Sequence, residues 1–458
     1  MSRTRIPLVA ILLIGTIFYS WTLLKDRLIP GVDGPYYLIQ VENLLKEGRL
    51  KYGDPPFVFY VSAALTALLK DPTLAICLFV AIFSALSAVP AYLIVRRATR
   101  STMGGYAASL ACVFCPQLVR MAGDLMKNAV GIFFLLSFLY FLQMEVFSPS
   151  ELSLVLSVLS FYLTFLTHAL DFGFALLILL VYPCLALIIK REREVAVRWV
   201  AILVPCLLLV LASYLLLPNL FSDLGKGVKF LKDLLHLSHS RRLRPSEMPK
   251  PPRGPFLELI FDPYEAGFVV PALIAGCILA HEEFRKRSEA FPLLASAVVL
   301  GLLSAVVSGM PDWGWRFRLM TMVPISVVIG ALTSKIGSRT ASLSMVILLI
   351  GIIGIGAARV ALETHPLISR EEYEELEEAS KVVPQGSVVV IRSHVNPYWV
   401  EYLLGSDRAG RIASELWEAY DHVLMLVEPK GRVPKGEVLF MGRNFILLEI
   451  EPKGRSSP

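Results

Sequence analysis

The stretch GVDGPYYLIQVENLLKEGRLKYGDP, residues 31–55, comes shortly after an apolar segment, residues 6–24, that is long enough to cross a bilayer. Within the stretch, residues 35–47 place apolar and polar side chains on opposite faces of a helix, which predicts an amphipathic helix. Pro35 suits its first turn and Gly48 suits the position after its end. A spanning segment followed by such a helix predicts a membrane protein with a structured outer loop. Asp33 stands at the start of this loop.

The composition supports a polytopic α-helical membrane protein. Of 458 residues, 55% are hydrophobic and only 18% are charged, which excludes an ordinary soluble globular protein. Because a spanning helix needs about 20 mostly apolar residues, hydropathy predicts about eleven spans. They cover residues 6–24, 72–95, 103–119, 129–147, 152–168, 171–189, 196–217, 264–281, 290–309, 317–335 and 341–360.

The basic residues predict the topology. With a cytoplasmic N-terminus, basic residues gather in alternate connections, as the positive-inside rule requires. An odd number of spans then places the C-terminal tail outside, and we expect a multi-pass protein of the plasma membrane. One predicted outer loop, residues 218–262, is itself basic. Two interpretations of it stay open, a solvated surface and a patch that attracts lipid phosphates.

The predicted organisation has two parts. Residues 1–360 form a transmembrane domain, with a first outer loop at 25–71 and the long outer loop at 218–262. Residues 361–458 form a small extracytoplasmic α/β domain. Its first helix follows Ser369 as N-cap, SVVVIRS and HVLMLVE are strand patterns, and NPYWVEYLL and SELWEAYD are helical. EVLFMGRNFILLEI predicts a hairpin that turns at residues 442–444.

Ionisable and polar side chains gather at the predicted outer ends of the helices. Ionisable groups in so apolar a chain are costly, and they usually face a cavity or one another. Carboxylates close to Arg and Lys predict a site that handles a polar group at the membrane surface. The candidates are Asp33, Tyr36, Asp54, Asp124, Lys127, Asn128, His168, Asp171, Asp312, Arg316 and Arg318.

The acidic candidates also have simpler interpretations. Asp33 would favour the positive end of the 35–47 helix without any catalytic role, although Gly34 and Pro35 already provide a helix start. Asp124 would pair with Lys127 one turn further on. A functional role is the interpretation we favour for both carboxylates, because ionisable residues at the ends of spans are usually functional.

The remaining candidates divide in the same way. Arg316 and Arg318 would anchor a helix at the interface beside Trp313 and Trp315, but Arg also recurs where a phosphate is bound in a bidentate manner. His168 and Asp171 fit a helix cap as well as a site. No nucleic-acid partner is expected; the expected partners are membrane lipids.

Three motifs, VDGPYYLIQVENLLKEGRLKYGDPP, RMAGDLMKNAVGIFF and WRFRLMTMVPISVVIG, resemble the GT-C fold glycosyltransferases, in particular the membrane half of the oligosaccharyltransferase catalytic subunit. The resemblance implies a polyprenyl- or dolichyl-phosphate-linked sugar donor and a glycan, lipid or protein acceptor. It implies that Asp33 is the catalytic base or a metal ligand and that Asp124 assists. It also implies that Arg316 or Arg318 contacts the phosphate or the acceptor.

Two departures from that family bear on the acceptor and on a metal. The tail carries isolated Trp399 and Trp417 where oligosaccharyltransferases have a Trp-Trp-Asp motif, which argues against peptide asparagine as acceptor. Lys127 and Asn128 stand where the family has a metal-binding Glu. A divalent cation, Mg²⁺ or Mn²⁺, would have Asp33 and Asp124 as ligands.

The chemistry itself makes separate demands. Sugar transfer from a lipid phosphate needs a base for the acceptor hydroxyl, which Asp33 can provide, and cations for the leaving phosphate, which Arg316, Arg318 or Lys127 can provide. Attack opposite the phosphate gives inversion. The sequence therefore predicts an inverting membrane glycosyltransferase. The alternatives are an oligosaccharyltransferase-like protein glycosylation enzyme and a flippase or other transporter of lipid-linked sugars.

Overall fold

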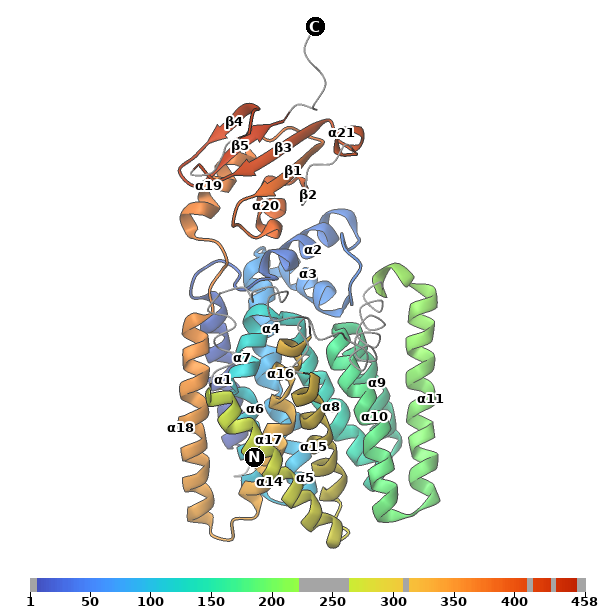
Figure 1. Cartoon of the computed structure of the whole chain (residues 1–458). Coiled ribbons are helices and arrows are strands. Elements are labelled where there is room, and N and C mark those ends of the chain that lie inside the picture. Colours follow the sequence, from blue (N-terminus) through green and yellow to red (C-terminus); the bar gives the residue numbers. More distant parts are fainter. Residues whose placement is uncertain (1–5, 222–262, 308–312, 410–414, 430–433, 451–458) are drawn as a thin grey trace, which may run out of the picture. The chain divides into compact units, whose positions relative to one another are not determined.

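The computed structural model describes residues 6–221, 263–307, 313–409, 415–429 and 434–450 (Figure 1). Asp312 and most of the predicted basic loop 218–262 lie outside these residues. The chain divides into two compact units, which we describe in turn. The first contains residues 1–23, 52–61 and 77–363, and the second contains residues 24–51, 62–76 and 364–458.

The first unit is a helix bundle. Its helices are α1 (Ile6–Leu24), α5 (Ala88–Thr99), α6 (Thr102–Val113), α7 (Pro116–Asp124), α8 (Met126–Phe147), α9 (Glu151–Thr167), α10 (Ala169–Lys190), α11 (Arg193–Leu216), the 3-10 helix η1 (Pro218–Phe221), α14 (Pro263–Arg285), α15 (Ala290–Val307), α16 (Gly314–Met320), α17 (Met322–Ser334) and α18 (Arg339–Glu363). The boundary between the units passes through α3 (Phe57–Leu69) and α4 (Pro72–Leu86).

Within the described residues, eight helical segments are long and apolar enough to cross a membrane. They are Ile6–Leu24, Pro72–Thr99, Thr102–Asp124, Met126–Phe147, Ala169–Lys190, Arg193–Leu216, Gly314–Ser334 and Thr340–Glu363. The protein is therefore a multi-pass membrane protein. The predicted spans at 152–168, 264–281 and 290–309 coincide with α9, α14 and α15, which are not among the eight. The count of eleven stays a prediction.

Side-chain exposure agrees with a lipid environment. α8 is almost entirely buried, and α9 and α10 lie beside it (Figure 1). By contrast, only 17% of the apolar window of α11 is buried. Its exposed side chains include Leu208, Leu211, Leu215 and Leu216. A soluble protein rarely leaves so continuous an apolar face in water, whereas lipid tails cover it without cost.

One proline and one pair of glycines determine how helices of the bundle are divided and packed. The predicted span 103–119 is two helices, because Pro116 begins α7 directly after the chain leaves α6 at Phe114. α6 and α17 approach so closely that a Cβ at Gly330 would lie 2.7 Å from the carbonyl oxygen of Gly104. Small residues at a helix crossing allow such close backbone packing in membranes.

The second unit combines a five-stranded sheet with helices from the predicted first outer loop and from the tail (Figure 1, sheet in red). The strands are β1 (Ser387–Arg392), β2 (Asp407–Ala409), β3 (His422–Val427), β4 (Glu437–Met441) and β5 (Ile446–Glu449), in the order β2-β1-β3-β5-β4. β2, β1 and β3 are parallel, and β5 is antiparallel to both β3 and β4. Val388, Val390, Val423, Met425, Val427, Ile446 and Leu448 form an apolar core on the sheet.

The helices of this unit are α2 (Gly34–Glu47), α19 (Arg370–Ser380), α20 (Pro397–Leu404) and α21 (Leu416–Ala419). α2 ends at Gly48, which is left-handed with a φ of 70°, and α19 begins with a capping box between Ser369 and Glu372. Both boundaries confirm the predictions from sequence. α20 packs against α2, so the compact unit that holds residues 364–458 also contains residues 24–51.

Candidate functional site

Asp124 and Lys127 lie where α7 gives way to α8. Asp124, the last residue of α7, forms an ion pair with Arg120 one turn earlier on the same helix. Lys127, in the first turn of α8, forms an ion pair with Asp54, which is 73 residues away in sequence. Asp124 and Lys127 thus each have an ion-pair partner other than the one that the sequence suggested, which was an Asp124–Lys127 pair. Arg120 was missed, although its i,i+4 spacing from Asp124 is a recognisable signal.

The Asp54–Lys127 pair is buried. The Lys127 and Asp54 side chains are 10% and 6% exposed, and the Lys127 Nζ lies 5.2 Å from the ring centre of Phe59. A charge held away from water is stabilised mainly by its partner, because the low dielectric strengthens their attraction while desolvation opposes it. The pair therefore places two polar side chains in contact with each other and away from water at the start of α8.

α16, which carries Arg316 and Arg318, packs against the same region. The Asn128 Nδ2 on α8 lies 3.5 Å from the Met320 Sδ on α16. α16 also contacts α7 and α15. The guanidinium carbon of Arg316 lies 5.2 Å from the ring centre of Trp315, a cation–π geometry. The aromatic neighbour agrees with the interfacial interpretation of this segment and leaves phosphate binding by Arg316 or Arg318 a prediction.

His168 and Asp171 stand at the start of α10. His168 is the N-cap, and its Nδ1 accepts a hydrogen bond of 3.3 Å from the backbone N–H of Leu170, so the capping interpretation is confirmed for this residue. Asp171 is fully buried, with its Oδ2 3.3 Å from the same Nδ1. A Cβ at Gly131 of α8 would collide with the Asp171 carboxylate, so this glycine makes room for it.

These contacts connect candidates from four parts of the first unit. Buried carboxylates, a lysine and an amide come from the segment before α3 and from α7, α8 and α10, and α16 packs beside them. The residues concerned are Asp54, Asp124, Lys127, Asn128 and Asp171. Polar groups at the ends of apolar helices can bind an anionic head group whose alkyl chain lies in the bilayer.

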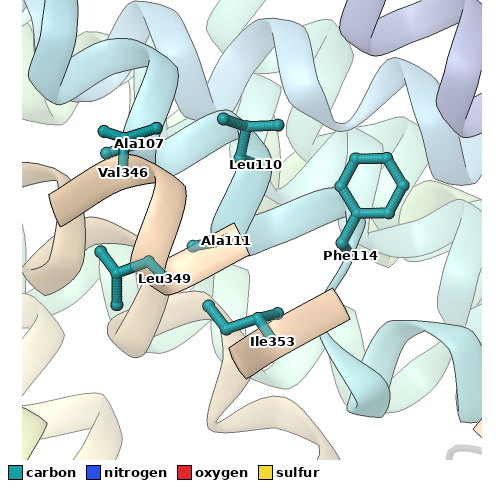
Figure 2. A pocket seen from close by; sticks show the side chains of 7 residues that line it. All are labelled: Ala107, Leu110, Ala111, Phe114, Val346, Leu349 and Ile353. Carbon is teal, nitrogen blue, oxygen red and sulfur yellow. The ribbon is translucent and has the colours of Figure 1, made fainter. Parts of the chain in front are cut away.

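An apolar pocket lies elsewhere in the first unit, between α6 and α18 (Figure 2). It is lined by Ala107, Leu110, Ala111, Phe114, Val346, Leu349 and Ile353. Its lining is entirely apolar and offers no group that takes part in polar chemistry.

Asp33 and Tyr36 belong to the second unit. Asp33 is the N-cap of α2 and its backbone carbonyl accepts from the Tyr37 N–H at 3.1 Å, but its side chain makes no cap hydrogen bond. The helix start therefore does not depend on the Asp33 carboxylate as a cap. The Tyr36 hydroxyl accepts a hydrogen bond from the Gln40 Nε2 at 3.0 Å. The roles of both residues stay predictions.

The described residues do not form a good site for a divalent metal. Among them no group of three His, Cys, Asp or Glu side chains is arranged to hold a metal ion. Asp124, one of the two expected ligands, is already paired with the Arg120 guanidinium.

The family of dolichyl-phosphate-mannose-protein mannosyltransferases matches residues 53–220. The matched region contains Asp54, Asp124, Lys127, Asn128, His168 and Asp171, and it excludes Asp33 and the arginines of α16. No curated protein matches the chain.

Three solved structures show the fold. ArnT from Cupriavidus metallidurans in the apo state is 13% identical with a TM-score of 0.63, over 96% of this chain and 97% of that one. The Archaeoglobus fulgidus oligosaccharyltransferase, crystallised with Zn and sulfate, is 14% identical with a TM-score of 0.58 over 87% of this chain.

The arabinofuranosyltransferase AftD from Mycobacteria is 14% identical with a TM-score of 0.52 over 85% of this chain. This chain spans 62% of the length of the oligosaccharyltransferase and 30% of that of AftD. At such identities the likeness concerns the fold, and the chain has the GT-C fold of membrane glycosyltransferases.

Proposed function

We propose that the protein is a glycosyltransferase that moves a sugar from a polyprenyl- or dolichyl-phosphate donor to a lipid, glycan or protein acceptor. The observation that carries the proposal is the cluster of buried polar groups at the ends of α7, α8 and α10. The mannosyltransferase family match covers this cluster, and the GT-C fold supports the same class of enzyme. The departures noted in the tail favour an acceptor other than peptide asparagine.

The proposed reaction is an inverting displacement. The acceptor oxygen attacks the anomeric carbon, its proton passes to the Asp33 carboxylate, and the bond from that carbon to the phosphate oxygen breaks with its electron pair on the phosphate. Asp33 is proposed as base because the resemblance to the GT-C glycosyltransferases implies this role for an acidic residue of the first outer loop. Arg316, Arg318 and Lys127 are proposed to stabilise the leaving phosphate, with Asp124 as an assisting acid.

The topology is part of the proposal. α9, α14 and α15 would complete eleven spans together with the eight segments identified by length and hydropathy. The N-terminus would then be cytoplasmic and residues 361–458 extracytoplasmic, with the reaction on the outer face of the plasma membrane.

Transfer of labelled sugar by the purified protein tests the proposal. Polyprenyl-phosphate sugars are offered to the wild type, to Asp33→Asn and to Glu47→Gln, which changes an exposed carboxylate at the other end of α2. Transfer by the wild type and by Glu47→Gln, but not by Asp33→Asn, is expected. Equal transfer by all three would exclude Asp33 as base.

Two further arms decide the class of protein and the metal. Loss of transfer after a chelator is added would show that the reaction depends on a metal, to which the proposed mechanism assigns no role. Absence of transfer with every donor, combined with movement of the labelled lipid across vesicle bilayers, would identify a transporter instead of an enzyme.

A further inference from the structure

We propose that Asn396, in the tail, is a positioning residue for the chain segment that carries Asp33. The inference rests on the proposed function, in which Asp33 is the base. It is drawn from contacts within the second compact unit, which holds both residues. The tail would then contribute to catalysis by holding the segment that carries the base.

The segment before Asp33 is attached to the tail at three points. The Asp26 Oδ2 lies 3.0 Å from the His365 Nδ1. The Gly31 N–H donates to the His365 carbonyl at 3.1 Å, where Gly31 and Pro366 form an isolated parallel β-bridge. The Asn396 Nδ2 donates to the Val32 carbonyl at 2.7 Å, one residue before Asp33. The last contact joins residues 364 positions apart in sequence.

Asn396 uses both ends of its carboxamide. Its Oδ1 accepts from the Tyr398 N–H at 2.9 Å, which caps α20, while its Nδ2 donates to Val32. The cap fixes the side chain on the tail, and the second bond fixes the Val32 carbonyl to the side chain. One residue therefore links the start of α20 to the start of α2.

Neighbouring contacts hold the other parts of the loop. The rings of Tyr36 and Tyr398 meet edge to face, with centroids 5.2 Å apart, and the Arg408 guanidinium lies 3.9 Å from the Tyr398 ring centre. Glu401, buried on α20, pairs with Arg408 at 2.8 Å and with Lys51 at 2.9 Å. Lys51 lies shortly after the C-terminal end of α2, so contacts with the tail hold α2 at both of its ends.

A base that must reach an acceptor hydroxyl depends on such support. A displacement of about 1 Å in a reacting group can cost on the order of a hundredfold in rate. The hydrogen bond from Asn396 acts on the peptide group that joins Val32 to Asp33, so its loss changes the backbone directly beside the base. The expected effect is on the chemical step and not on donor binding.

Asn396→Ser isolates this bond. Serine caps a helix about as well as asparagine, so α20 is kept, but its hydroxyl replaces the longer amide donor that reaches Val32. We expect kcat to fall about tenfold to a hundredfold with KM for the donor nearly unchanged. Asn396→Asp, which keeps the cap and presents an acceptor to the carbonyl, is expected to lower kcat at least as far. Both variants should melt close to the wild type.

Hydrogen exchange provides a readout that does not need activity. In Asn396→Ser the amides of Gly31 and Tyr37, which donate to the His365 and Asp33 carbonyls, are expected to exchange about fivefold faster, the equivalent of one lost hydrogen bond, while those of α19 stay unchanged. Unchanged exchange and unchanged kcat in both variants would overturn the inference, and so would a fall in kcat that follows the melting temperature alone. If the wild type transfers no sugar, the proposed function fails, and the exchange experiment still decides whether Asn396 holds the segment.

Discussion

The buried pair of Asp54 and Lys127 leads to the sharpest prediction about stability. Lys127→Met leaves the Asp54 carboxylate, 6% exposed, without this partner. Breaking a buried ion pair by removal of one member typically costs about 3–5 kcal/mol, because the remaining charge is desolvated without compensation. Loss of the Lys127 cation–π contact with Phe59 adds on the order of 1 kcal/mol. We expect a total loss of about 4–6 kcal/mol.

The double variant Asp54→Leu/Lys127→Met should behave differently. Replacement of both members of a buried pair by apolar side chains is often neutral or stabilising. We therefore expect the double variant to be nearly as stable as the wild type and far more stable than Lys127→Met. Its transfer activity then separates two roles of Lys127. A stable but inactive double variant indicates phosphate binding, whereas a stable and active one indicates that Lys127 only neutralises Asp54.

The assay is reversible unfolding in mixed micelles, followed by tryptophan fluorescence. Lys46→Met serves as the control, because Lys46 is 71% exposed and its i,i+4 pair with Glu42 is worth at most about 1 kcal/mol. If Lys127→Met unfolds as the control does, the buried-pair argument is refuted. A double variant as unstable as Lys127→Met would refute the expected coupling.

Two further predictions concern pH and helix packing. The ring nitrogens of His394 lie 2.8 Å and 2.7 Å from Glu428 and Glu372, and hydrogen bonds to these carboxylates raise the pKa of His394. The folding stability that protonated His394 contributes is therefore complete below about pH 6.5 and is lost as the pH rises through the pKa of His394 in the folded protein. His394→Gln should consequently lower the melting temperature most in acid. Gly330→Ala should cost about 1–3 kcal/mol in unfolding experiments, since the new Cβ meets the Gly104 carbonyl.

Controls for these two variants come from the same chain. Gly351→Ala should be harmless, because a Cβ there has no heavy atom within 4 Å. If Gly330→Ala is equally harmless, the close crossing of α6 and α17 is wrong. Melting curves of His394→Gln that differ from the wild type by the same amount at every pH would show that the imidazole charge does not contribute.

Local patterns in the sequence determined much of the helical architecture. Hydropathy within single segments predicted the spanning helices, because desolvation of a backbone in lipid depends on about 20 consecutive residues. Pro35, Gly48 and Ser369 likewise predicted helix ends, because a helix end depends on residues that are neighbours in sequence. The strand patterns SVVVIRS and HVLMLVE predicted β1 and β3, and the hairpin pattern around residues 442–444 predicted the β4–β5 pair.

Partners distant in sequence were decided only by the tertiary structure. No local pattern indicated that Lys127 meets Asp54, or that Gly131 makes room for Asp171. The order β2-β1-β3-β5-β4 and the bond from Asn396 to Val32 likewise depend on how whole segments pack. The sequence thus determined which polar groups lie at helix ends, because burial and charge are local costs. The fold decided which of them pair, because pairing energy depends on distances that only the packed chain establishes.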